Sequence, residues 1–197
     1  MSTLGMIGAL DRLRDELRAA GGLLAGELLD DPATRPWPTG SYSAEPDPPT
    51  GAAPKPTPGS LAATGPRAAL ATAEYEFLVE AIYEGYLLHY EIPRLFREGD
   101  PDMALLVGDR LYALGLERLV ALGDITAVVE LADVISLCAL AHARGHGELA
   151  GPIWSAGARA VGWGPSPAHA AAKALVRTGD DRAGAALDAL NGSPGDS

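Results

Sequence analysis

The sequence predicts an all-α protein, and three observations lead to this prediction. The composition is 47% hydrophobic but only 6% aromatic, and alanine and leucine, which favour helices, are abundant. Apolar residues recur every three or four positions along several segments, and the alternation typical of strands is missing. Proline, glycine, serine and aspartate stand where helices begin and end. The chain of 197 residues is therefore expected to contain one helical domain, preceded by a helix and a linker.

Residues 1–30 are predicted to form an amphipathic N-terminal helix, bent or broken by two glycines at positions 21 and 22. Its apolar stripe consists of Leu4, Ile7, Leu10, Leu13 and Leu17. Charged side chains lie between these residues, so one face is polar. The apolar stripe needs a partner, which can come from this chain or from another.

Residues 31–66 are predicted to be a disordered linker. The segment holds ten of the sixteen prolines, together with Gly, Ser, Thr and Ala, and it has no apolar period. The stretch "RPWPTGSY" is the exception, because Trp37 and Tyr42 could dock on a surface.

The main helical domain is expected over residues 67–191, followed by a flexible tail at 192–197. Its first helix runs from about residue 68 to 90, where Pro93 stops it. The second is capped by Asp100, has Pro101 at its first position and ends before Gly123. The third runs from 124 to about 144 and is apolar on nearly all sides, which indicates a central helix. Shorter helices are expected at about 153–161, 167–178 with Ser166 as cap, and 182–190.

Charge and cysteine content argue against several classes of protein. The net charge is -11, from 26 acidic and 15 basic residues, whereas nucleic acids and anionic membrane surfaces require Lys and Arg. No uncharged apolar run reaches the roughly 18 residues of a membrane span, and the N-terminus does not resemble a signal peptide. The single cysteine, Cys138, lies in an apolar run and is interpreted as a buried hydrophobic residue. We therefore expect a cytoplasmic protein without a nucleic-acid partner or a transmembrane segment.

The segment "VEAIYEGYLLHYEIPR", residues 79–94, carries an acidic stripe on a predicted helix. One side of the helix holds Leu78, Ile82, Gly85 and His89, and the opposite side holds Glu76, Glu80, Glu84 and Glu91. Two interpretations of the stripe stay open, of which the first is favoured: a solvated face, or carboxylates of a magnesium site. His89, on the apolar side, is interpreted as a hydrogen-bonded core histidine.

This segment resembles a helix of the trans-polyprenyl diphosphate synthases. In that family a helix of the form E-x-x-H-x-x-x-L-L-H-D-D ends in the first aspartate-rich motif, DDxxD, whose carboxylates hold magnesium on the allylic diphosphate. The matching positions are Glu80, Leu87, Leu88 and His89. The three aspartate positions hold Tyr90, Glu91 and Arg94. Two of the three magnesium ligands are thus missing.

The resemblance continues over about residues 73–150, roughly the first half of a synthase core. The stretch "ALLVGDRLYALG" is similar to the family's A-x-L-x-G-D-x-L-x-x-x-A, so Gly108 is expected to let two helices approach closely, with Asp109 at their crossing. The stretch "ELADVISLCALAHARGHGEL" resembles the segment that runs into the family's Gly-Glu or Gly-Gln. The resemblance implies a helical domain like the first half of an isoprenoid synthase core.

The departures from the family pattern decide the function that the resemblance implies. The Arg-Arg-Gly that grips diphosphate is missing, since "LFREGDPD" and its preceding residue offer only Arg94 and Arg97, and the second aspartate motif is missing too. Ionisation of an allylic diphosphate requires magnesium and Arg or Lys held ready at the leaving group. Some synthases of the family are heterodimers in which a small subunit without working motifs supports a catalytic one. The chain resembles such a non-catalytic partner subunit, with no cofactor of its own and magnesium only through its catalytic partner.

The partner is expected to be a catalytic synthase or a second copy of this chain. Candidate interface residues are Leu106, Leu111 and Leu114. Two alternatives stay open: a helical interaction or scaffold protein unrelated to prenyl transfer, and an enzyme of another class. The residues of that enzyme would be Glu80, Glu84, Glu91 and Arg94. A metal site at His142 and His146 is a weaker hypothesis, because Gly145 and Gly147 indicate the end of the helix there.

Overall fold

The protein is all-α, as predicted. The computed structural model describes residues 3–29, 56–97 and 99–192, and these ranges contain no β-strand. The helices are α1 (Thr3–Ala20), α2 (Gly22–Glu27), α3 (Pro58–Ala63), α4 (Thr72–Tyr90), α5 (Pro101–Ala121), α6 (Ile125–Ala143), α7 (Ala150–Trp163), α8 (Pro167–Thr178) and α9 (Ala183–Gly192). Short 3₁₀ turns lie at Pro66–Ala68 and Gly147–Leu149.

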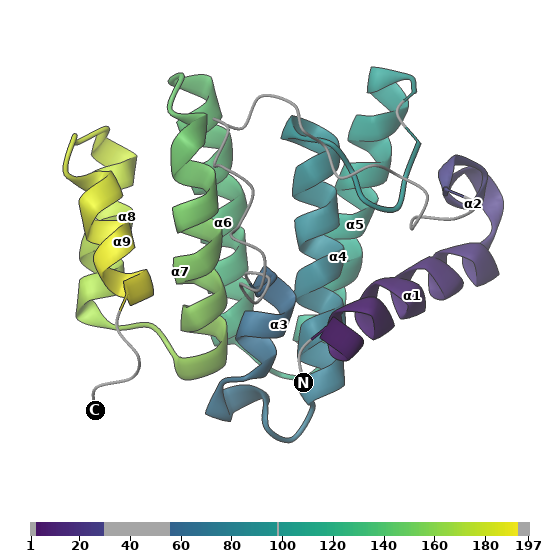
Figure 1. Cartoon of the computed structure of the whole chain (residues 1–197), viewed down its shortest axis with the longest axis horizontal. Helices are drawn as coiled ribbons and strands as arrows, with labels where there is room; N and C mark the ends of the chain where they lie inside the picture. Colours follow the sequence, from purple (N-terminus) through teal and green to yellow (C-terminus); the bar gives the residue numbers. More distant parts are fainter. Residues whose placement is uncertain (1–2, 30–55, 98, 193–197) are drawn as a thin grey trace, which may run out of the picture.

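The last six helices run alternately up and down (Figure 1). In this view α5 lies behind α4, α6 lies behind α7, and α8 and α9 form a hairpin at the left edge. The short helix α3 packs against both α4 and α7, and α1 crosses α4 next to α3 (Figure 1). One cluster of buried side chains runs through all of these helices, from Leu13 in α1 to Leu187 in α9.

The helix boundaries follow local capping signals. The Asp100 carboxylate accepts a hydrogen bond from the Asp102 N–H, with Pro101 at the first position of α5. Asp124 caps α6 through the Ala127 N–H, and Ser166 caps α8 through the N–H of the third residue of that helix. Gly123, between α5 and α6, has a φ of +76°, a conformation that side chains with a Cβ rarely adopt. The predicted boundaries of these helices are therefore confirmed.

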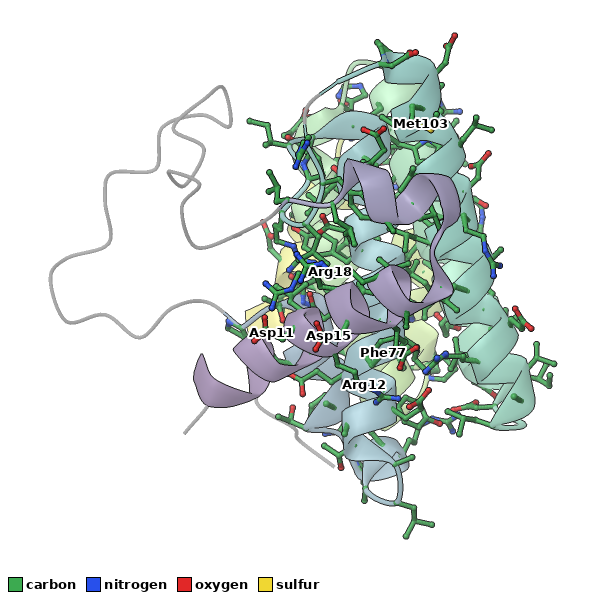
Figure 2. The ribbon with its side chains drawn as sticks, turned by 90° about the vertical axis from the view of Figure 1, so that its right-hand side faces the viewer. Asp11, Arg12, Asp15, Arg18, Phe77 and Met103 are labelled. Carbon is green, nitrogen blue, oxygen red and sulfur yellow. The ribbon has the colours of Figure 1, made fainter. Side chains whose placement is uncertain are left out.

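The N-terminal helix finds its partner within the chain. Leu13 and Leu17 are buried, and α1 packs across α4. Arg12 donates to Glu74 of α4 at 2.6 Å, and its guanidinium lies 4.4 Å from the centre of the Phe77 ring (Figure 2). At least this part of the stripe therefore needs no second protein.

The linker ends earlier than predicted, because residues 56–66 are folded. Gly59, Ala62 and Ala63 of α3 are buried, and Thr57 caps the helix by accepting from the Ser60 N–H. Sequence periodicity missed α3 because the helix is short and its buried residues are glycine and alanine, with Leu61 as its one large apolar side chain. The expectations for Trp37 and Tyr42, and for the tail after residue 192, lie outside the described residues.

Glycines allow two close backbone contacts. A Cβ added to Gly85 of α4 would lie 2.9 Å from the carbonyl oxygen of Gly108 in α5, so the predicted close approach at Gly108 is confirmed. A Cβ on Gly65, just after α3, would lie 2.2 Å from the carbonyl carbon and oxygen of Gly162 in α7. Both contacts are between main chains, which cannot move aside as a flexible side chain can.

The prediction that α6 is a central helix is wrong for one of its faces. Its inner face is buried, but Ile125 and Val129 are 58% and 53% exposed.

Among the described helices α6 is also the one whose length and hydropathy would allow it to cross a membrane. This is weak evidence for a span, because core helices of soluble proteins have the same properties, and no transmembrane segment is clearly indicated.

Replacement of Gly65 by alanine is expected to destabilise the fold by about 1–3 kcal/mol, because the new methyl group would press on the Gly162 backbone. The midpoint and slope of urea unfolding would measure the loss. Gly8→Ala is the matched control, since a Cβ at this exposed position of α1 meets nothing within 4 Å and improves helix propensity. Equal stability of Gly65→Ala and the wild type would contradict the close contact of α3 with α7.

Candidate functional site

The segment that resembles the first aspartate-rich motif ends in a buried ion-pair cluster of Glu80, Glu84 and Arg94. The Arg94 guanidinium donates from Nη1 to Glu80 Oε2 at 2.7 Å and from Nε to Glu84 Oε2 at 2.9 Å. Both glutamate side chains are 0% exposed, and that of Arg94 is 20% exposed. We call these three residues the Arg94 cluster.

Backbone groups complete the hydrogen bonding of the two carboxylates. Glu84 Oε1 accepts from the N–H groups of Arg94 and Leu95, at 2.6 and 2.7 Å. Glu80 Oε1 accepts from the N–H of Gly59 in α3, at 2.9 Å. All four carboxylate oxygens therefore have donors from the protein, which offsets much of the free energy lost when charges leave water.

The local sequence explains how Arg94 reaches two residues of the preceding helix. Glu80 and Glu84 are four residues apart, so both lie on one face of α4. The helix ends at Tyr90, Glu91 adopts an extended conformation, and the chain turns back along α4. The predicted solvated face is wrong for Glu80 and Glu84, because the return of the chain and α3 cover it.

The electrostatics of the cluster keep Arg94 charged. Burial alone would lower the pKa of Arg94, but the charges of Glu80 and Glu84 and their hydrogen bonds outweigh burial and raise the pKa. The guanidinium also lies 4.9 Å from the centre of the Tyr83 ring. A permanently charged guanidinium thus occupies the space between the two carboxylates.

The other motif positions serve packing. Tyr90 stacks on His142 of α6 with ring centres 4.3 Å apart, and Leu87 and Leu88 are buried. Glu91 is half-buried and takes no part in the Arg94 cluster. In the described part of the chain, no group of three or more His, Cys, Asp or Glu side chains is placed to hold a metal ion.

His89 and Asp109 lie together at the crossing of α4 and α5, but not as predicted in detail. His89 Nε2 is 3.2 Å from Asp109 Oδ1, without the geometry of a hydrogen bond. The ring of His89 instead stacks on Tyr112, with centres 5.1 Å apart, and Asp109 is 71% exposed. The prediction of a hydrogen-bonded core histidine is therefore wrong, and stacking positions the ring.

The three candidate interface leucines do not share one surface. Leu106 is 62% exposed, beside the exposed Leu105, whereas Leu111 is fully buried and Leu114 is half-buried in the core. Five residues turn a helix by about 140°, so Leu106 and Leu111 point away from each other. Of the three, Leu106 is the one with a mostly exposed side chain.

A second charged cluster, which sequence reasoning missed, joins α8 to α6. Lys173 donates to Glu130 Oε2 at 2.9 Å and to Asp133 at 2.7 Å, and Arg177 donates to Asp133 at 2.7 Å. His169 Nδ1 lies 3.3 Å from Glu130 Oε2. The sequence did contain a signal for this cluster. The three basic residues of α8 are four positions apart and the two acidic residues of α6 are three positions apart, so each set lies on one face of its helix.

The pKa values in this second cluster shift in both directions. Burial lowers the pKa of His169, and Lys173 adds to this effect, while Glu130 opposes it. Burial tends to raise the pKa of Asp133, but its hydrogen bonds and the charges of Lys173 and Arg177 lower it. The folded protein thus favours neutral His169 and ionised Asp133.

His142 and His146 are not brought together. His142 Nε2 lies 3.1 Å from the Tyr86 hydroxyl, and His146 Nδ1 lies 3.2 Å from the exposed Glu148.

His146 and Glu148 line a recess of about 330 Å³ between the ends of α6, α8 and α9, together with Arg144 and Asp180. Arg144 is held there by the carbonyl groups at the end of α8, and Asp180 pairs with Arg182.

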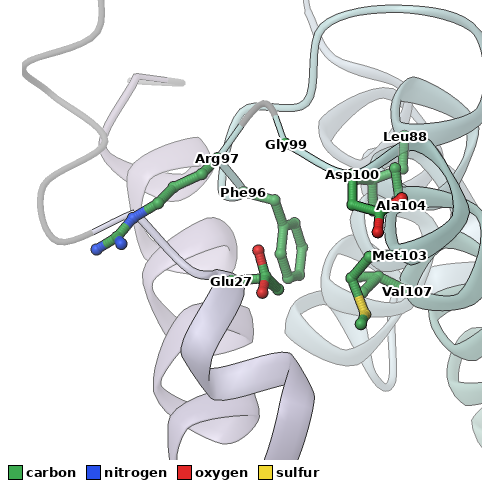
Figure 3. Close-up of a pocket in the computed structure, with 9 residues that line it drawn as sticks. All are labelled: Glu27, Leu88, Phe96, Arg97, Gly99, Asp100, Met103, Ala104 and Val107. Carbon is green, nitrogen blue, oxygen red and sulfur yellow. The ribbon is translucent and has the colours of Figure 1, made fainter.

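A much smaller recess lies near the end of α4. Its walls come from α2, α4, the segment after α4 and the start of α5 (Figure 3). The residues are Glu27, Leu88, Phe96, Arg97, Gly99, Asp100, Met103, Ala104 and Val107. The free space of about 10 Å³ is close to that of a single water molecule.

In comparisons with known proteins, no family model, curated protein or solved structure matches this chain. The resemblance to trans-polyprenyl diphosphate synthases therefore rests on the residues of α4 to α6.

Replacement of Arg94 by methionine is expected to reduce the free energy of unfolding by about 3–5 kcal/mol, because two buried carboxylates lose their counter-charge. Urea unfolding would measure the change. Arg110→Met, on the exposed face of α5, is the control and should leave stability nearly unchanged. An Arg94→Met variant as stable as the wild type would show that the cluster is not a structural ion pair.

The stability of the fold is expected to fall as the pH drops below about 6.5, the usual pKa of histidine, because of His169. Its pKa is lower in the folded state, so the unfolded chain binds more protons in this range and is favoured. Thermal unfolding between about pH 7 and 5 would measure the slope, which should be shallower in His169→Gln. His146→Gln, at an exposed site, should keep the wild-type slope, and an equal effect of both substitutions would rule out this role of His169.

Proposed function

We propose that this chain is a non-catalytic partner subunit of a polyprenyl diphosphate synthase and supports chain elongation by a motif-bearing subunit. The proposal combines the resemblance of α4 to α6 with one observation, the closed Arg94 cluster. At the third aspartate position of the resembling motif stands Arg94, and its charge is directed into the helix, toward Glu80 and Glu84. A site that would bind magnesium in the family is replaced here by an internal ion pair.

The chemistry of prenyl transfer supports a role without catalysis. The reaction requires several magnesium ligands and cationic groups at the diphosphate. Glu80 and Glu84 already accept hydrogen bonds on every carboxylate oxygen, and Glu91 is separate from them. A magnesium ion at these glutamates would have to displace Arg94, which would leave a guanidinium in a mostly buried position without its counter-ions.

The small space beside the resembling motif supports the same proposal. The recess next to Leu88 and Phe96, near the resembling motif, has about 10 Å³ of free space, too little for an isoprenoid chain (Figure 3). The close contact of Gly85 with Gly108 also brings α4 and α5 together along their length. Magnesium and substrate would therefore be bound by the partner.

The partner is proposed to contact α5 near its N-terminal end. Leu105 and Leu106 are 44% and 62% exposed there, at the same end of the bundle as the C-terminus of α4 (Figure 1). Adjacent exposed leucines are the kind of apolar patch that protein partners cover. The cytoplasmic location expected from the sequence belongs to this proposal.

A helical interaction or scaffold protein unrelated to prenyl transfer is the second candidate. The same closed cluster and the same exposed leucines favour it, because neither depends on a synthase. The third possibility, an enzyme that uses Glu80, Glu84, Glu91 and Arg94, is less favoured. Three of these residues form ion pairs with one another, and the fourth lies outside their cluster.

Binding to a motif-bearing synthase encoded in the same genome tests the proposal. The purified chain alone should produce no prenyl product from an allylic diphosphate, isopentenyl diphosphate and magnesium. Mixed with the synthase, it should form a complex and change the rate or the product length. Leu106→Asp should weaken the complex by about tenfold or more, equivalent to roughly 1.4 kcal/mol.

Ala113→Asp provides the control, because it places the same charge at an exposed position further along α5. It should leave binding unchanged. A synthase whose association, rate and product length are all indifferent to the chain would contradict the partner-subunit function. Prenyl product from the purified chain would contradict the absence of catalysis.

A further inference from the structure

The outer face of α6 carries an uncharged seam along its whole length. Its residues, spaced alternately four and three apart, are Ile125, Val129, Ala132, Ser136, Ala139 and Ala143. All but the half-buried Ala139 are exposed. The spacing is that of the contact positions of a coiled coil, which keep one face toward a partner helix. We call these six residues the α6 seam.

The opposite face of α6 is fully engaged within the chain. Leu131, Val134 and Cys138 are buried, and a Cβ added to Gly157 of α7 would lie 2.1 Å from Val134 Cγ2. The two acidic residues of α6, Glu130 and Asp133, point toward α8, where Lys173 pairs with both. The α6 seam is therefore on the solvent side of α6, the helix that lies behind α7 in Figure 1.

The lack of charge on this face indicates that another molecule covers it. The chain carries 41 charged side chains, 26 acidic and 15 basic, yet none of the six seam positions holds one. A helix face in water usually carries charged or polar side chains. Exposed Val120 and Leu122, at 55% and 42%, extend the apolar surface beyond the N-terminal end of the seam.

We propose that the α6 seam binds a second copy of this chain, with the two α6 helices antiparallel. The seam has large residues at its N-terminal end and alanines at its C-terminal end. In an antiparallel pair Ile125 meets Ala143 of the partner subunit, and Val129 meets Ala139 of the partner subunit. At the centre Ala132 meets Ser136 of the partner subunit, so large residues pack against small ones toward both ends and two small residues meet in the middle.

Charge supports a second copy as the occupant. Each copy has a net charge of -11, so an uncharged surface is where two copies meet with the least electrostatic repulsion. The seam is such a surface. A two-fold axis would place the large residues at one end of the seam against the small residues at the other end of the second copy's seam. A nucleic acid or an anionic membrane would require Lys or Arg on the face, and the seam has neither.

The dimension of the contact is compatible with a dimer. A helix of 19 residues is about 28 Å long, and small residues at its centre allow the two axes to approach closely. A stable interface buries about 1,000 Å² or more, so Val120 and Leu122 are expected to contribute at the two ends of the contact. The seam is separate from Leu105 and Leu106, so this inference is independent of the proposed synthase partner.

Sedimentation of the full-length chain over about 1–100 μM tests the proposal, with micromolar association as the expected result. The wild type should be a dimer. Ser136→Glu should be a monomer, because it places a charge at the centre of the seam in each copy. Val129→Lys should have the same effect. Both positions are exposed, so circular dichroism should match that of the wild type.

Ala185→Glu is the matched control, since it adds a glutamate at an exposed position of α9, and it should remain a dimer. A monomeric wild type, or a folded Ser136→Glu variant that stays dimeric, would overturn the proposal. Co-flotation of a monomeric wild type with anionic lipid vesicles would assign the face to a membrane surface instead. These outcomes leave the synthase-binding experiment unaffected.

Oxidative cross-linking tests the antiparallel order. An equimolar mixture of Ile125→Cys and Ala143→Cys should give a disulfide-linked dimer, because a disulfide requires Cα atoms about 4.4–6.8 Å apart. Each variant alone should not cross-link, and the buried Cys138 of the wild type should not either. A cross-link of Ile125→Cys with itself would mean a parallel pair and would overturn the proposed arrangement.

Discussion

Arg94 lies between two carboxylates that have no contact with water, and three segments of the chain meet around it. Glu80 and Glu84 come from α4, Arg94 from the segment after α4, and the N–H of Gly59 brings α3 to Glu80. The same segment also holds the end of α2, through the hydrogen bond from the Arg97 N–H to the Glu27 carbonyl. Buried charges of this kind contribute little net stability when all are paired, but the loss of one partner is strongly unfavourable. The cluster therefore specifies one arrangement of these segments.

The Arg94 cluster also limits the chemistry open to this chain. A carboxylate that accepts hydrogen bonds on both oxygens, beside a guanidinium that stays charged, is a poor ligand for a cation. In the segment that resembles a magnesium motif, the Glu80 and Glu84 carboxylates are thus already used in ion pairs and hydrogen bonds that stabilise the fold. This competition between structural ion pairing and ligand binding is the basis of the proposed supporting function.

The surfaces of the bundle differ in the kind of contact they suit. The α8–α9 hairpin is joined to α6 by a network of ion pairs around Lys173, which uses the acidic residues of α6. With those charges directed toward α8, the remaining outer face of α6 is uncharged. The leucines at the start of α5 form a second apolar area, separate from the first. The two proposed contacts, with a second copy and with a different protein, would therefore use different surfaces of the chain.

The sequence by itself determined the fold class and most helix boundaries, because caps act within one turn of the chain. Asp100, Asp124 and Ser166 accept hydrogen bonds from residues two or three positions ahead, so their role is visible in the sequence. Only the tertiary structure decided that Glu80 and Glu84 are buried, since that depends on where Arg94 and α3 return in space. The same holds for Leu111, which the packing of α5 turns inward, and for the folding of residues 56–66. Periodicity reports which residues share a face, but the neighbour of each face is set by contacts between residues far apart in the chain.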